Sequence, residues 1–122
     1  VLHDPRLSET GQRITGWHDT LVTLGEMIRA FAPKADSIAN LRRRLDSIPE
    51  SQRARYRDTA REVNEIAPLT SELRGRLIGL YNQIADWPGN LTTDQRTQLA
   101  YYRDFMARLE PRMGRVLGAR IR

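Results

Sequence analysis

Apolar residues recur along this chain in steps of three and four, which is the spacing of one face of a helix. Three such series account for most of the sequence, and each gives its segment one side to bury. No stretch alternates with period two for long enough to predict a strand. The sequence therefore predicts an all-α protein. The three series are Ile14, Trp17, Leu21, Leu24, Ile28, Phe31, Ala35, Ile38, then Tyr56, Thr59, Val63, Ile66, Thr70, Leu73, Leu77, Leu80, Ile84, Trp87, and finally Leu99, Tyr102, Met106, Leu109, Met113, Val116.

The series divide the chain into three helices joined by short turns. We expect helices at about 10–48, 51–86 and 93–118, all within a single bundle. Residues 1–9 are expected to form an extended lead-in. Short connections place consecutive helices antiparallel to one another, so the predicted architecture is an elongated antiparallel three-helix bundle.

The ends of these helices carry recognisable capping residues. Ser8 or Thr10 can cap the first helix by accepting a backbone N–H at its start. Thr92 and Gln95 have the spacing of a capping box, in which each side chain accepts from the other's backbone. Gly118 is the expected end of the last helix.

Three prolines, Pro33, Pro68 and Pro111, fall inside the periodic segments. Each removes a backbone hydrogen bond and clashes with the carbonyl four residues earlier. At Pro33 the apolar series stays in phase, which favours a kinked but continuous helix. At Pro68 the hydroxyls of Thr70 and Ser71 offer alternative hydrogen bonds, which favours a break. The bundle is therefore expected to contain proline kinks or breaks.

The charge of the chain is concentrated toward its C-terminus. The 122 residues carry 20 basic and 15 acidic side chains, a net charge of +5, and contain no cysteine. The last twelve residues hold four arginines and no acid. Such an excess can attract anionic partners. Without cysteine, the chain has neither disulfides nor a thiolate for catalysis or zinc binding.

A stripe of arginines in the last helix is the main candidate for partner binding. Arg108, Arg112, Arg115 and Arg122 are spaced by four, three and seven, which places them on one side of the helix beside the apolar series. A basic amphipathic helix can contact anionic lipid or phosphates. It can also pair with acidic side chains of a protein, for which the forked guanidinium is well suited.

Trp87 and the run Arg42-Arg43-Arg44 are two further candidates for partner contact, and each also has an ordinary structural explanation. Trp87 lies in a Trp-Pro-Gly loop and is a candidate contact residue, although it also continues the apolar series and is expected to close the end of the core. The run Arg42-Arg43-Arg44 has Asp36 and Asp46 nearby, so a solvated helix face is the favoured interpretation.

No constellation of residues predicts catalysis, a metal site, a cofactor or a small-molecule substrate. His3 and His18 have no converging ligands, which a metal site requires. The acidic residues of the second helix are expected to pair locally with its arginines at helical spacing. These acids are Asp58, Glu62 and Glu65, and the arginines are Arg55, Arg57 and Arg61.

The chain resembles the C-terminal helical segment of secreted bacterial BNR-repeat proteins, which are sortilin-like β-propellers often labelled glycosyl hydrolases. The resemblance rests on Asp4-Pro5-Arg6-Leu7 ahead of the long helix, on Pro68-Leu69 followed by Leu73 and Leu77, and on Thr92 with Gln95. Leu91 stands where the family has proline. The resemblance implies an extracytoplasmic helical tail with no catalytic residues to carry over.

These observations favour a non-enzymatic helical scaffold or interaction domain. We expect an accessory or structural subunit, or a tail domain, in an extracytoplasmic or membrane-associated assembly, with the chain itself either periplasmic or secreted, or else peripheral to a membrane. Its expected partner is a larger protein assembly such as a membrane-protein complex. The alternative is binding of nucleic acid or anionic lipid through the arginine-rich last helix.

Overall fold

The computed structural model describes residues 5–118, with side chains described from residue 16 onward. Three long helices dominate: α1 (Pro5–Asp46), α3 (Arg57–Asp86) and α4 (Thr93–Leu117). A short α2 (Glu50–Arg53) and a 3₁₀ turn, η1 (Ala54–Tyr56), connect α1 to α3. The described part of the chain contains no strand, so the all-α prediction is confirmed.

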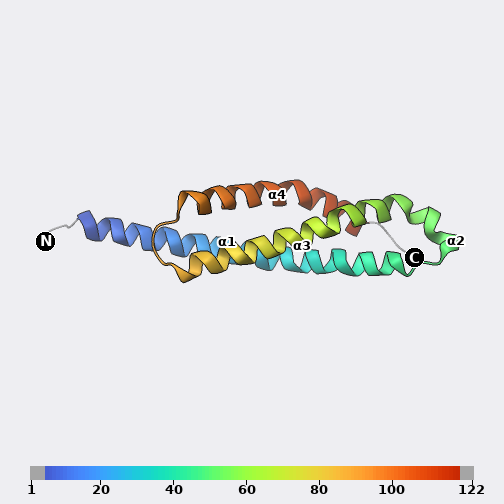
Figure 1. Cartoon of the computed structure of the whole chain (residues 1–122), viewed down its shortest axis with the longest axis horizontal. Coiled ribbons are helices and arrows are strands. Elements are labelled where there is room, and N and C mark those ends of the chain that lie inside the picture. The colour runs from blue at the N-terminus through green and yellow to red at the C-terminus, as the bar shows by residue number, and fades with distance from the viewer. Residues whose placement is uncertain (1–4, 119–122) are drawn as a thin grey trace.

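The three long helices lie side by side and give the molecule its elongated shape (Figure 1). α3 runs back along α1, and α4 runs back along α3. With 42 residues, α1 is about 63 Å long at ~1.5 Å per residue. Its beginning extends past the loop that joins α3 to α4, while α4 ends short of α2. The bundle is thus a long α1–α3 hairpin with a shorter helix packed along it.

The core is formed by the apolar series that the sequence predicts. Because each series keeps its phase along a helix, its members meet along the bundle axis. Thr70 is buried among them and donates its hydroxyl to the Ala67 carbonyl at 2.9 Å, which satisfies its polar atom. The least exposed side chains of the core are Leu24, Phe31, Ile38, Val63, Ile66, Leu73, Leu77, Ile84 and Met113.

All three prolines lie inside continuous helices, so the break predicted at Pro68 is wrong. Pro33, Pro68 and Pro111 are each exposed, as are the residues four positions earlier. The carbonyl that loses its helical partner therefore lies on a face of the helix that water can reach. Since the apolar series stays in phase on the opposite face, burial holds each helix together across its proline.

The helix starts differ from the predicted ones at two places. α1 begins at Pro5 instead of residue 10, so residues 5–9 are helical where an extended lead-in was predicted, and Ser8 and Thr10 lie inside the helix. Proline suits the first position of a helix because no partner is lost there. The helix predicted from residue 51 is interrupted by η1, and α3 begins only at Arg57.

The connection from α3 to α4 follows the predicted turn chemistry. Gly89 has a φ of +137°, which side chains rarely tolerate. The Gln95 N–H donates to the Thr92 hydroxyl at 3.0 Å, and the Thr92 N–H donates to the Gln95 side chain at 2.9 Å. This reciprocal pair confirms the capping box and fixes the start of α4. Gly118 is the C-cap, with right-handed backbone angles.

Candidate partner-binding groove

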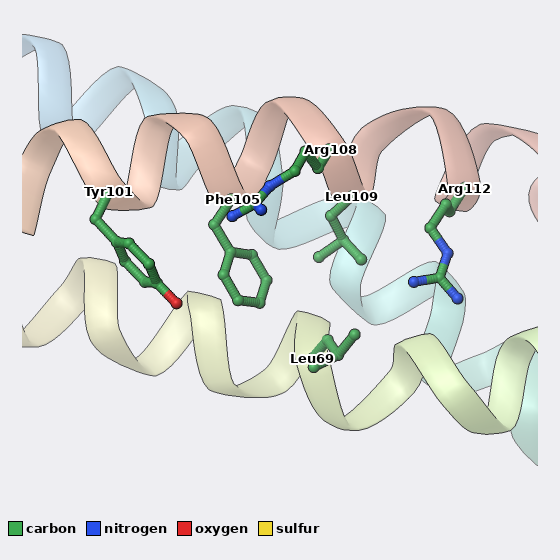
Figure 2. Close-up of a pocket in the computed structure, with 6 residues that line it drawn as sticks. All are labelled: Leu69, Tyr101, Phe105, Arg108, Leu109 and Arg112. Carbon is green, nitrogen blue, oxygen red and sulfur yellow. The ribbon is translucent and has the colours of Figure 1, made fainter.

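An apolar groove runs between α3 and α4 on the side away from α1 (Figure 2). It consists of two adjoining cavities of about 360 and 320 Å³, which share Tyr101 and Phe105. In Figure 2 these two rings point from α4 toward α3, and Leu69 points up from α3 beneath them. The apolar lining is made of Leu69, Leu73, Tyr101, Tyr102, Phe105 and Leu109.

The aromatic residues of the groove differ in how far they enter the core. Tyr102 is buried, whereas Tyr101 is 56% exposed and Phe105 is half-buried. The Tyr101 ring meets those of Tyr102 and Phe105 edge to face, with centroids 5.9 and 6.2 Å apart. Such contacts fix the ring orientation. Tyr101 therefore presents a held, largely uncovered aromatic face at the mouth of the groove.

Charged residues line the groove alongside these rings, with a positive balance. Three arginines, Arg76, Arg108 and Arg112, belong to its lining, together with one acid, Glu72. Arg76 lies 3.6 Å from Glu72, one turn earlier on the same helix. Exposed pairs at this separation are weak and exchange readily. The groove thus combines an apolar floor with a net positive rim.

Arg112 joins the two helices that form the groove. Its Nε donates to Oε1 of Glu62 at 2.6 Å, and its Nη2 lies 2.8 Å from Oε1 of Glu65. The hydrogen bond from Arg112 is the main cause that lowers the pKa of Glu62. The two carboxylates raise the pKa of Arg112 in turn. Glu62 and Glu65 therefore pair between helices, whereas the sequence predicted pairing with arginines of their own helix.

The predicted arginine stripe is divided by this arrangement. Arg112 is 28% exposed and paired with two carboxylates, which leaves it less available to a partner, and its role in partner binding stays a prediction. Arg108 lies at the groove and makes an exposed 3.6 Å pair with Asp104. Arg115 is exposed, and its charge contributes to lowering the Glu62 pKa. Arg122 lies outside the described residues.

Trp87 is exposed, and another tryptophan takes the position expected for it. Trp87 is 77% exposed because the chain leaves the helix there, with φ −129° and ψ 80°, which takes the side chain out of the phase of its apolar series. Trp17 packs against the core and donates its Nε1–H to the Ile84 carbonyl at 2.7 Å. The prediction that Trp87 closes the core is wrong, and it lies apart from the lining of the groove.

The fold gathers positive charge in the half of the molecule that contains α2. Contacts of Lys34 with Glu110 and of Arg112 with Glu62 show that residues 33–68 and 107–118 share this half. Together these residues carry eleven basic and seven acidic side chains. Residues 16–32 and 69–106, in the other half, carry five basic and six acidic ones. Among residues 16–118 the excess positive charge therefore lies in the half that contains α2, and it extends beyond the C-terminal helix.

Other kinds of site are limited in the described part of the chain. Among residues whose side chains are described, no three His, Asp or Glu converge in a way that could hold a metal ion. Within the same part, no helix has both the length and the apolar character needed to cross a membrane. His18 is exposed on α1.

The groove was missed by the sequence analysis, although a signal for it exists. Leu69 and Tyr101 each stand one position away from a member of the apolar series, next to Thr70 and Tyr102. A large apolar residue beside the series widens the apolar face and marks an edge that the bundle leaves uncovered.

Comparison with known proteins gives no relative from which a function can be inferred. No protein-family model, no curated protein and no solved structure matches this chain. The resemblance to the C-terminal segment of BNR-repeat proteins stays a prediction.

Proposed function

We propose that this chain is a non-enzymatic helical interaction domain whose α3–α4 groove binds an apolar segment of a partner protein that carries acidic side chains. The observation that carries the proposal is the exposed Tyr101 ring, which lies edge to face against Phe105 in an apolar groove with a positive rim. Apolar patches framed by polar residues are typical of protein contact sites. Aromatic and arginine side chains are also the residues most enriched among strong contacts.

The charge of the groove specifies the chemistry of the partner. Three arginines and one glutamate line it, so an acidic segment is favoured over a basic one. Arg108 has only an exposed pair with Asp104 at 3.6 Å, so it can turn to a partner carboxylate at small cost. Arg112 contributes less because Glu62 and Glu65 already neutralise it.

We further propose that the partner belongs to a larger extracytoplasmic assembly, such as a membrane-protein complex, in which this chain is an accessory subunit or tail domain. This part of the proposal is supported by the resemblance at Asp4-Pro5-Arg6-Leu7 and Pro68-Leu69 to secreted proteins. The elongated shape of the three-helix bundle suits a structural role.

The proposal is tested with designed helical peptides as probes. One peptide presents leucines on one face and glutamates beside them, and a second has lysine in place of each glutamate. We expect the glutamate peptide to bind at least about tenfold more tightly, a difference of ~1.4 kcal/mol. Tyr101→Ala is expected to weaken it by a similar factor, and Arg108→Glu to reverse the preference between the two peptides. Trp87→Ala is the matched control, because it removes an exposed aromatic residue outside the groove.

Two outcomes would overturn the groove as the binding site. One is equal binding of both peptides. The other is a loss of binding in Trp87→Ala with none in Tyr101→Ala. Photo-crosslinking from position 101 in the native source, with position 87 as control, then identifies the natural partner.

The alternative function is binding of nucleic acid or anionic lipid by the last helix. It is less favoured because Arg112, one of the four arginines in its stripe, is paired with Glu62 and Glu65. Within the described part of the chain, Arg57 and Arg61 near α2 form no ion pair.

A further inference from the structure

We propose that the cavity at the α2 end of the α1–α3 hairpin binds a ligand bearing two or more phosphate groups, held by Arg53, Arg57 and Arg61. This cavity has a volume of about 440 Å³ and is separate from the α3–α4 groove. Its lining residues are Leu45, Asp46, Ile48, Arg53, Ala54, Tyr56, Arg57, Ala60, Arg61 and Asn64. The site does not depend on the partner proposed above.

The three arginines come from two helices that meet at this cavity. Arg57 and Arg61 are four residues apart on α3, so they lie on one face of it. Arg53 ends α2, and its Nε donates to the Ile48 carbonyl at 3.3 Å, which holds its stem against the turn. The chain therefore brings three arginines to the lining of one cavity at the end of the hairpin.

The arginines of this cavity form no ion pair in the described part of the chain, a property they share with other exposed arginines such as Arg42 and Arg103. Within the described part of the chain, neither Arg57 nor Arg61 forms an ion pair, whereas Arg112, Arg108 and Arg74 each do. Asp46 is the one acidic residue in the lining. Like charges four residues apart on a helix repel one another. A bound anion would relieve that repulsion, so the arrangement favours an anionic ligand.

The chemistry of the lining favours phosphate. Guanidinium groups bind phosphate oxygens with two parallel hydrogen bonds, and three of them suit a ligand with several charges. The Asn64 side chain adds a neutral donor at the same hollow. The volume is in the range of small-ligand sites. Leu45, Ile48 and Ala60 supply apolar walls against which an organic part of the ligand can pack.

The test is a calorimetric titration of the whole chain with inorganic tripolyphosphate at low ionic strength. We expect saturable binding that Arg57→Gln and Arg61→Gln each weaken about tenfold and that the double variant abolishes. Arg55→Gln is the matched control, because Arg55 is an exposed arginine of the adjoining turn that lies outside the lining. The melting temperature of each variant checks the fold, and removing one of two repelling charges should leave it unchanged or higher.

A second arm separates the sources of the phosphate. Sedimentation with vesicles of phosphatidylglycerol and phosphatidylcholine measures binding to lipid headgroups. Tripolyphosphate binding that depends on Arg57 and Arg61 assigns the site to a soluble ligand, and vesicle binding alone with the same dependence assigns it to a headgroup. Failure of both probes would overturn the proposal, as would equal losses in Arg55→Gln and Arg57→Gln. Neither result would affect the groove, because Tyr101 and Arg108 are unchanged.

Discussion

Arg112 of α4 reaches across to Glu62 of α3, and the 2.6 Å hydrogen bond between Nε and Oε1 joins residues fifty positions apart in the sequence. Both side chains are about 30% exposed, which places the pair at the edge of the core. A second contact with Glu65 at 2.8 Å uses the other arm of the guanidinium. The pair therefore fixes how α4 is aligned along α3, and with it the shape of the groove.

Arg112→Ala is expected to lower the free energy of unfolding by about 1 kcal/mol, because Glu62 and Glu65 lose their shared partner. The corresponding fall in melting temperature is about 4 °C. The melting temperature of Arg112→Lys should lie between those of the natural chain and Arg112→Ala, because an ammonium group cannot form the forked contact. Arg103→Ala, at an exposed arginine of the same helix, serves as the control. A melting temperature equal to that of Arg103→Ala would show that the link does not stabilise the fold.

The same pair makes stability depend on pH. The pKa of Glu62 in the folded protein lies below its ordinary value of 4.5, chiefly because Arg112 donates a hydrogen bond to it. The unfolded chain therefore takes up this proton first as the pH falls, and the stabilisation present above pH 4.5 is lost as the pH falls through the lowered pKa. Glu62→Gln should be less stable than the natural chain at pH 7, and the difference should shrink below pH 4.5. Thermal melts across this range measure it, and a difference that does not change with pH would contradict the assignment.

Adjacent residues of α3 give a direct measure of the core. Leu77 is fully buried and Ile78 is 40% exposed. We expect Leu77→Ala to cost about 3 kcal/mol, because it removes apolar contacts and leaves a cavity. Ile78→Ala, which removes a similar number of atoms, should cost about 1 kcal/mol or less. Denaturant unfolding of the two variants makes the comparison, and equal losses would show that this segment of α3 faces the core differently.

The two tryptophans are expected to report on different environments. Trp17 is partly buried and bonded to the Ile84 carbonyl, whereas Trp87 is largely exposed. Trp87→Phe keeps only the partly buried Trp17, so the emission of this variant should lie at shorter wavelength than that of the natural chain. Its free energy of unfolding should change by less than about 0.5 kcal/mol. Trp17→Phe leaves the exposed ring and removes a hydrogen bond, so emission should shift to longer wavelength and stability should fall by about 1 kcal/mol. Identical spectra would contradict these placements.

The sequence predicts the helices because their signal is local and repeated. Each apolar series extends over many turns, so its period is clear, and the capping box at Thr92 and Gln95 marks the start of α4. The prediction was wrong at Pro68 because the effect of a proline depends on which face it occupies. The helix continues through Pro68 because Pro68 and Asn64 are both exposed. Which face of α3 is exposed is set by the packing of α1 and α4 against it.

The candidate sites depend on contacts between helices, which a pattern along one chain does not specify. Arg112 looks like a free member of a stripe until α3 brings Glu62 beside it. Tyr101 and Leu69 become a groove only when α4 lies on α3. The spacing of Arg53, Arg57 and Arg61 by four was readable from the sequence, but their common cavity requires the turn through α2 and η1.

The two halves of the elongated bundle differ in net charge, so the molecule is electrostatically polar along its long axis. Of the residues whose side chains are described, 33–68 and 107–118 carry a net charge of +4, while 16–32 and 69–106 carry −1. A field from a polyanionic surface acts on such a molecule as a torque, turning the α2 end toward the surface within about 10 Å of it at moderate salt. The bundle would then stand upright, with the start of α1 pointing away and the α3–α4 groove held part-way along its height, open to a partner approaching from the side.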